Sequence, residues 1–101
     1  MLAEQTAAHP ATRLEPPEVE ELARQVPEWR LAEGELRREW RFADFTQAMS
    51  FVNRVAGLAQ EVDHHPDIEI SYSVVRLRLA THKVGGLTRH DFILAARIDR
   101  L

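Results

Sequence analysis

Three histidines stand where their side chains could transfer protons. His64 and His65 are adjacent and precede Pro66, and His82 follows Thr81 further along the chain. An imidazole exchanges protons near neutral pH, because its unperturbed pKa is about 6.5. These residue types therefore point to general acid–base catalysis, in which one ring donates a proton and another accepts one.

The same histidines allow less specific interpretations. A histidine pair after a helix interacts favourably with the negative end of the helix dipole, so surface or capping histidines are one alternative. Together with Asp91 the three could ligate a metal ion, although adjacent histidines rarely face one ion. The chain contains no cysteine, which excludes disulfides, thiolate nucleophiles, zinc fingers and iron–sulfur clusters.

The histidine pair follows the most regular helical pattern of the chain. Asp44 and Gln47 have the spacing of a capping box at a helix start. Apolar residues then recur at helical spacing as far as Val62, and Pro66 disfavours the helical conformation of the residue before it. We therefore expect a helix from about residue 44 to Asp63 or His64, with the pair at its carboxyl end.

His82 follows a segment, Ile68 to Thr81, that is typical of a strand. The apolar alternation changes parity near Val74 and Val75, so we expect one strand with a bulge, or with both faces buried at that point. After a glycine pair, Thr88 and Asp91 have the spacing of the N-cap and N3 residues of a last helix.

The first half of the chain predicts a short helix and a hairpin. Two prolines at 16–17 suit the first turn of a helix, which Pro27 ends. Residues 29–31 and 36–42 flank a turn around Gly34 and have the pattern of antiparallel strands. Arg38 falls on the apolar parity, so we expect it near a sheet edge or a partner subunit.

Together these elements predict an α+β fold in the order α-β-β-α-β-α. The order contains no internal repeat, so we expect an antiparallel sheet with the helices packed on one face. A length of 101 residues suits one domain. Residues 1–14 lack periodicity and are expected to form a flexible N-terminal tail, with residues 15–101 as the single domain.

Charge and hydropathy exclude several classes of protein. Thirteen basic and sixteen acidic residues give a net charge of −3, without the positive field of a nucleic-acid-binding protein. No apolar run approaches the roughly 18 residues of a membrane span, and the start of the sequence does not resemble a signal peptide. We expect a cytoplasmic protein that binds neither nucleic acid nor membranes.

The linked spacing of the histidine motifs resembles the signature of the pterin-4a-carbinolamine dehydratases (4a-hydroxytetrahydrobiopterin dehydratases). The matching segments are Glu61-Val62-Asp63-His64-His65-Pro66, Tyr72, Leu79-Ala80-Thr81-His82, and Gly86-Leu87-Thr88 with Asp91. Upstream agreement comes from Trp29, Phe42-Ala43-Asp44-Phe45 and residues 51–56. The resemblance covers roughly residues 15–101, and two linked histidine motifs are more specific than a single one.

The resemblance implies a hydro-lyase that removes water from a 4a-hydroxytetrahydropterin, giving quinonoid dihydropterin in tetrahydropterin recycling. It implies no metal and no cofactor, because electron donation from N5 of the pterin expels the hydroxyl. His64, His65 and His82 would be the catalytic histidines. The residues implied in substrate binding are His64, His65, Pro66, Thr81, His82, Lys83, Trp29 and Asp91. Asp91 would be either part of the site or only a helix cap.

Two positions depart from the family pattern, and other functions remain open. Gln60 stands where some relatives have glutamate, and His90 where some have arginine. Family members are commonly dimers or tetramers, so a homodimer or homotetramer is implied. The main alternative is a non-catalytic dimerisation or interaction module, since some animal members also serve as partners of a homeodomain transcription factor. A histidine-based metal-binding protein is the less favoured alternative.

Overall fold

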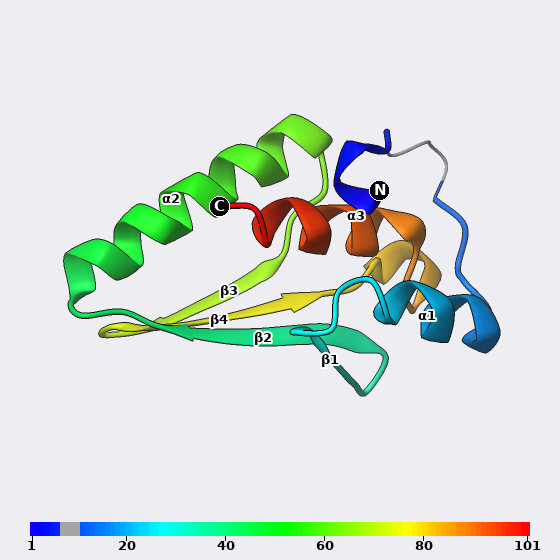
Figure 1. Ribbon diagram of the computed structural model, residues 1–101, viewed down its shortest axis with the longest axis horizontal. Coiled ribbons are helices and arrows are strands. Elements are labelled where there is room, and N and C mark those ends of the chain that lie inside the picture. The colour runs from blue at the N-terminus through cyan, green and yellow to red at the C-terminus, as the bar shows by residue number, and fades with distance from the viewer. Residues whose placement is uncertain (7–10) are drawn as a thin grey trace.

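Within residues 1–6 and 11–101, which the computed structural model describes, the chain forms a four-stranded antiparallel sheet with helices above it (Figure 1). The helical elements are η1 (Leu2–Glu4), α1 (Pro16–Ala23), α2 (Phe45–Val62), η2 (His82–Val84) and α3 (Arg89–Ile98). The strands are β1 (Arg30–Ala32), β2 (Glu35–Arg41), β3 (Asp67–Ser71) and β4 (Val74–Leu79). Their order in the sheet is β1-β2-β4-β3.

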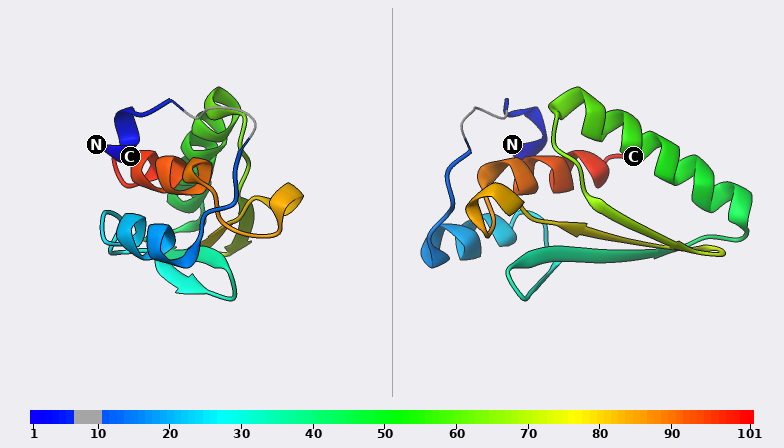
Figure 2. Two further views of the ribbon diagram at one scale, coloured as in Figure 1. Left: turned by 90° about the vertical axis from the view of Figure 1, so that its right-hand side faces the viewer. Right: turned by 180° about the vertical axis from the view of Figure 1, so that it is seen from behind.

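Helices α2 and α3 cover the same face of the sheet, as the two views of Figure 2 make clear. The predicted α+β class, with helices on one face of an antiparallel sheet, is confirmed. A side-chain cap stands at the start of α2 and of α3 as expected, but of these two only the one at α3 is a reciprocal capping box. Gln47 N donates to Asp44 Oδ1 at 2.8 Å at the start of α2, and Thr88 and Asp91 form the reciprocal pair at the start of α3.

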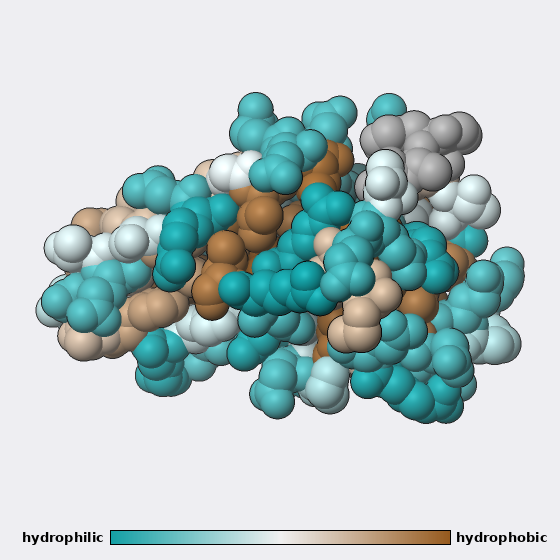
Figure 3. Space-filling model, turned by 45° about the horizontal axis from the view of Figure 1, so that its top comes forward, coloured by the Kyte–Doolittle hydropathy of each residue, from teal (hydrophilic) through white to brown (hydrophobic). Residues whose placement is uncertain are grey.

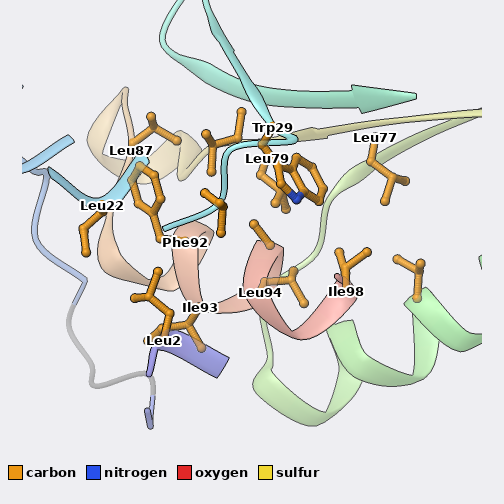
Figure 4. Close-up of a cluster of buried hydrophobic side chains, with 14 of the residues drawn as sticks. Leu2, Leu22, Trp29, Leu77, Leu79, Leu87, Phe92, Ile93, Leu94 and Ile98 are labelled. Atoms are coloured by element: carbon orange, nitrogen blue, oxygen red, sulfur yellow. The ribbon is translucent and has the colours of Figure 1, made fainter. Parts of the chain in front are cut away.

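The core lies between the sheet and these helices (Figure 4). Alternate residues of a strand face the same side, so Leu36 of β2 and Leu77 and Leu79 of β4 all point toward the helices and are fully buried. Phe92 and Leu94 of α3 are also fully buried. Each such side chain contributes about 1.5–3 kcal/mol by leaving water, which holds α3 firmly against the sheet.

The segment predicted as one strand, residues 68–81, is a hairpin of two strands. β3 and β4 are antiparallel, with Ser71 opposite Val74 and Ile70 opposite Val75. The expected bulge was therefore wrong. The chain reverses direction between the two strands, so the apolar residues before the turn and those after it face the same side of the sheet. The turn lacks the usual glycine or asparagine, and Tyr72 itself takes the left-handed conformation with φ 56°.

The first hairpin is confirmed, and Arg38 lies near a sheet edge as expected. Strand β1 pairs with β2 only as far as Arg37, so within the described residues Arg38 has a strand partner on the β4 side alone, opposite Leu77. Arg38 Nη1 donates to Asp99 Oδ1 at 2.6 Å, and its guanidinium lies 4.7 Å from the ring centroid of Trp40. The charged group of Arg38 thus reaches the end of α3 and also packs against an aromatic ring.

Part of the segment expected to be a flexible tail packs on α3. Leu2 in η1 is 2% exposed and joins the core. Arg97 donates from Nε to Ala3 O at 2.9 Å and from Nη2 to Gln5 O at 2.7 Å. A single buried leucine gives no periodic signal, which is why the sequence pattern did not reveal this contact. Residues 7–10 lie outside the described residues.

The surface over the helices is mainly hydrophilic, with apolar side chains showing between the polar ones (Figure 3). Partly buried apolar residues of this layer are Val52, Leu58, Val62 and Ala96. None of the helices within the described ranges has both the length and the apolar character needed to cross a membrane.

Candidate active site

The end of α2 determines where His64 lies. Asp63 follows the helix with φ 53°, a left-handed conformation that ends the helical path. In consequence the backbone N–H of His64 donates to Ala59 O at 3.0 Å, below the last turn of α2. The chain then enters β3 through Pro66, so His64 is held between a capped helix and a strand.

Asp91 joins the start of α3 to the segments before it. Its side chain is fully buried. Oδ2 accepts hydrogen bonds from the backbone N–H of Thr88 and from the hydroxyl of Thr81, both at 2.9 Å. Oδ1 lies 2.5 Å from Nε2 of His64. Asp91 therefore caps a helix with one oxygen and contacts a predicted catalytic histidine with the other.

The contact with Asp91 determines which nitrogen of His64 is available for chemistry. A carboxylate only accepts hydrogen bonds, which favours the tautomer of His64 that carries its proton on Nε2. Nδ1 has no hydrogen-bond partner among the described residues, and in that part of the chain no buried side-chain nitrogen or oxygen lacks one. Nδ1 of this largely buried ring is therefore open to solvent.

His82 is far more exposed than His64. Its side chain is 75% exposed, and Nε2 lies 3.7 Å from Oδ2 of Asp67, which is itself 47% exposed. At that distance the two groups form an ion pair only when the imidazole is protonated. Sequence reasoning did not single out Asp67, although its place directly after the His64-His65-Pro66 segment was an available signal.

His65 contacts Gln60 on the outside of α2. Nε2 of His65 lies 2.6 Å from Oε1 of Gln60, and both residues are exposed. The amide oxygen is an acceptor, as a glutamate oxygen would be. The departure from the family pattern at this position therefore keeps a hydrogen-bond partner for His65 and removes a charge.

The two histidine motifs converge on the start of α3. His64 contacts Asp91 directly, and Thr81, which precedes His82, hydrogen-bonds the other oxygen of the same carboxylate. Asp67, the neighbour of His82, follows His64 by three residues, a span of at most about 10 Å. The predicted residues near this cluster are His64, His65, Pro66, Thr81, His82, Lys83 and Asp91.

Trp29 is not brought to this cluster. It is 4% exposed, and its indole N–H donates to Asp99 Oδ1 at 2.8 Å. Asp99 follows the carboxyl end of α3, whereas Asp91 lies in the first turn. Trp29 is therefore a core residue beside the carboxyl end of α3. The sequence pattern could not show which end of α3 it packs against.

A hollow of about 530 Å³ on the outer face of the sheet contains none of the predicted site residues. It is lined largely by charged side chains, among them Arg37 and Arg76. The hydrogen bonds that Arg37 donates to Glu35 raise its pKa, and those that Arg76 donates to Glu69 and then to Glu39 raise the pKa of Arg76. Cations held in this way do not exchange protons near neutral pH, so the arginines of this hollow are no candidates for acid–base groups.

The metal-binding interpretation requires several ligands around one point. Within the described ranges no group of three or more histidine, aspartate or glutamate side chains is close enough to hold an ion. The carboxylate of Asp91 instead receives its hydrogen bonds from Thr81, Thr88 and His64.

Comparison with known proteins identifies the family of this chain. The family model described as Pterin 4 alpha carbinolamine dehydratase matches residues 12–101. A protein of Rubrobacter xylanophilus with the provisional name pterin-4-alpha-carbinolamine dehydratase is 49% identical over 85 residues, which cover 83% of this chain and 79% of that protein. A protein of Picosynechococcus with the same provisional name is 45% identical over 91 residues, covering 90% and 99%.

Two solved structures share the fold. The crystal structure of a transcriptional coactivator/pterin dehydratase from Brucella melitensis has a TM-score of 0.82 and 31% identity, covering 88% of this chain and 97% of that one. A pterin dehydratase-like RuBisCO assembly factor of the alpha-carboxysome has a TM-score of 0.58 and 23% identity, covering 71% and 83%. On the matched family model and the identity to these relatives, the chain belongs to the pterin 4 alpha carbinolamine dehydratase family of hydro-lyases.

Proposed function

We propose that this hydro-lyase removes water from a 4a-hydroxytetrahydropterin by histidine acid–base catalysis, as a step in tetrahydropterin recycling. One observation carries the proposal: the buried carboxylate of Asp91 ties His64 to Thr81, and so brings together the two segments that carry the predicted catalytic histidines. A carboxylate that orients an imidazole is a recurring arrangement for general bases.

The reaction needs one proton acceptor and one proton donor. The N5–H bond of the pterin and its C4a–O bond break, a double bond forms between N5 and C4a, and water leaves. The electron pair from N5 expels the hydroxyl, so the reaction is neither an oxidation nor a reduction. An acid that protonates the departing hydroxyl and a base that accepts the N5 proton each contribute about 10²–10⁴-fold to such reactions.

The environments of His64 and His82 suit different roles. With Nε2 directed to Asp91, His64 presents the lone pair of Nδ1 and acts as the base, and Asp91 stabilises the imidazolium that forms. His82, whose side chain lies beside Asp67, delivers a proton to the hydroxyl. Its exposed side chain can move toward the substrate when this binds.

The remaining predicted residues serve substrate binding in this proposal. His65 is oriented by Gln60, and Lys83 is exposed on η2 beside His82. We also propose that the chain forms a homodimer or homotetramer, since β1 and β3 are the edge strands of the sheet within the described residues. Sedimentation at micromolar concentration should then give a mass above that of one chain, and a monomer alone would contradict self-association.

A dehydration assay with synthetic 4a-hydroxytetrahydropterin tests the catalytic proposal. The purified chain should accelerate the reaction over its uncatalysed rate, and a variant with His64, His65 and His82 all replaced by alanine should not. The matched control replaces Arg37, Glu39 and Arg76 on the outer face of the sheet with alanine and should retain the activity. Equal activity of the wild-type and triple-histidine proteins would contradict histidine catalysis.

The alternative is a non-catalytic interaction module. It is favoured by the descriptions of two structures with this fold, a transcriptional coactivator/pterin dehydratase and a RuBisCO assembly factor. The same assay separates the two functions, because an interaction module has no reason to accelerate dehydration. An inactive wild-type chain, folded and at the concentration used for sedimentation, would favour the alternative.

A further inference from the structure

A buried residue beside His64 has no part in the chemistry described above. His90 lies in the first turn of α3 and is 4% exposed. The centroid of its ring is 5.8 Å from that of His64, and the ring planes meet at 80°. This is the edge-to-face geometry in which aromatic rings prefer to pack. His64 therefore contacts two consecutive residues of α3, through a hydrogen bond to Asp91 and through its ring to His90.

The hydrogen bond to Asp91 alone does not determine the plane of the His64 ring. The χ2 angle of histidine has broad preferences, and one hydrogen bond at Nε2 still allows the ring to rotate. Rotation changes the direction in which Nδ1 points, and Nδ1 is the nitrogen left open to solvent. A ring packed edge to face against His90 opposes that rotation, because turning either plane replaces a favourable contact with a clash or a gap.

We propose that His90 is a positioning residue, which holds the imidazole of His64 in the orientation that presents Nδ1 to the substrate. This inference rests on the proposed role of His64 as the base. The Thr88–Asp91 capping box fixes the first turn of α3, so the same turn supplies both contacts to His64. His90 acts through His64 and need not contact the substrate itself.

The residue type at position 90 fits this role. An arginine, which some relatives have there, would bring a permanent positive charge next to His64 and Asp91. An imidazole offers a flat ring of similar size to that of His64 and carries no permanent charge. Histidine at position 90 thus gives His64 a planar neighbour and adds no permanent charge beside the His64–Asp91 pair.

Three substitutions test the inference. His90→Leu keeps an apolar bulk but removes the ring, His90→Phe keeps a ring, and Phe92→Leu removes a fully buried ring from the same helix as the matched control. The measurements are kcat and KM for dehydration, the melting temperature, and the position of the Cε1–Hε1 NMR cross-peak of the His64 imidazole in the protein without substrate.

For His90→Leu we expect kcat to fall about two- to tenfold, the range that an edge-to-face ring contact corresponds to, with KM unchanged. The His64 cross-peak should move and broaden as the ring gains a second orientation. His90→Phe should restore kcat and a single sharp cross-peak. Phe92→Leu should lower the melting temperature and leave both the kcat of the folded protein and the His64 cross-peak unchanged.

A wild-type kcat and an unmoved His64 cross-peak in His90→Leu would overturn the inference, as would a loss in His90→Phe equal to that in His90→Leu. If His90→Leu does not fold, His90→Gln replaces it with the same expectations. His64→Ala separates this failure from that of the proposed function. An active His64→Ala protein would refute the base role of His64, whereas an inactive one with wild-type His90→Leu would refute only the positioning role.

Discussion

The two contacts between a histidine and a carboxylate in this site differ in nearly every physical respect. Nε2 of His64 lies 2.5 Å from a fully buried Asp91, and the His64 side chain is 12% exposed. Nε2 of His82 lies 3.7 Å from Asp67, and these side chains are 75% and 47% exposed. The same pair of residue types is thus tightly held at one place and loosely held at the other.

The difference shows what burial does to a polar contact. A buried carboxylate that loses a partner pays the full desolvation of its charge, so the geometry around Asp91 is strongly favoured over alternatives. Water screens and replaces the contact between His82 and Asp67, and such exposed pairs contribute about 0–1 kcal/mol. The side chain of His64 is therefore held in one place, whereas that of His82 has room to move.

Replacing the two carboxylates should give the largest contrast. Asp91→Ala removes the N3 side chain of the capping box and leaves Thr81, Thr88 and His64 without their acceptor. We expect a loss of about 2–4 kcal/mol in the free energy of unfolding and a fall of more than about 10 °C in melting temperature. Denaturant unfolding and thermal melts measure both.

The matched substitution Asp67→Ala should change the free energy of unfolding by no more than about 0.5 kcal/mol. This substitution also removes a carboxylate from the site, but one that belongs to the exposed contact with His82. Equal destabilisation by Asp67→Ala and Asp91→Ala would mean that burial does not distinguish the two contacts.

The histidines themselves should separate stability from activity. His64→Ala and His82→Ala are each expected to lower kcat by about a hundredfold or more. His64→Ala should also cost about 1–3 kcal/mol of unfolding free energy, because Oδ1 of Asp91 then lies buried without a partner, whereas His82→Ala should leave the melting temperature unchanged. The sequence pattern alone, in which both residues lie outside the apolar stripes, predicts that neither substitution affects stability.

Steady-state assays and thermal melts on the same protein preparations test this contrast. A similar loss of stability and of activity in both variants would identify the histidines as structural residues, and the assignment of His64 and His82 as base and acid would fail.

The pH dependence of kcat/KM should be bell-shaped after the uncatalysed rate is subtracted. At low pH the base that accepts the N5 proton is already protonated, and at high pH the acid has lost its proton, so the rate falls on both sides. His82→Ala should remove the alkaline limb and His64→Ala the acid limb. A profile that is flat from about pH 5 to about pH 9 would contradict histidine acid–base chemistry.

The smallest effect should come from His65 and its amide partner. His65→Ala and Gln60→Ala should raise KM about two- to tenfold at unchanged kcat, because an exposed hydrogen bond that orients a binding residue contributes little energy. Gln60→Glu keeps an acceptor and should retain the wild-type KM. Initial-rate kinetics over a range of substrate concentrations measure both parameters. A hundredfold fall in kcat for His65→Ala would place His65 among the acid–base residues instead.

Signals between neighbouring residues were enough to predict several elements of the fold. Apolar periodicity and the Asp44 cap predicted α2, and the Thr88–Asp91 spacing predicted the start of α3. Such signals act between residues a few positions apart, so they survive without knowledge of the fold. The hairpin at Tyr72 was not predicted, because its turn uses a residue type that rarely adopts positive φ. The linked histidine motifs were sufficient to indicate the family.

Which side chains meet depends on how the elements pack together. The contact of His64 with Asp91 joins residues 27 positions apart, and the approach of His82 to Asp67 depends on the antiparallel pairing of β3 with β4. Trp29 carried the same kind of resemblance as the histidines, yet packing placed it at the other end of α3. Burial is a property of the folded chain, because it depends on every element that covers a group. For that reason the contact of His64 with Asp91 is buried and that of His82 with Asp67 is exposed, although both join a histidine to an aspartate.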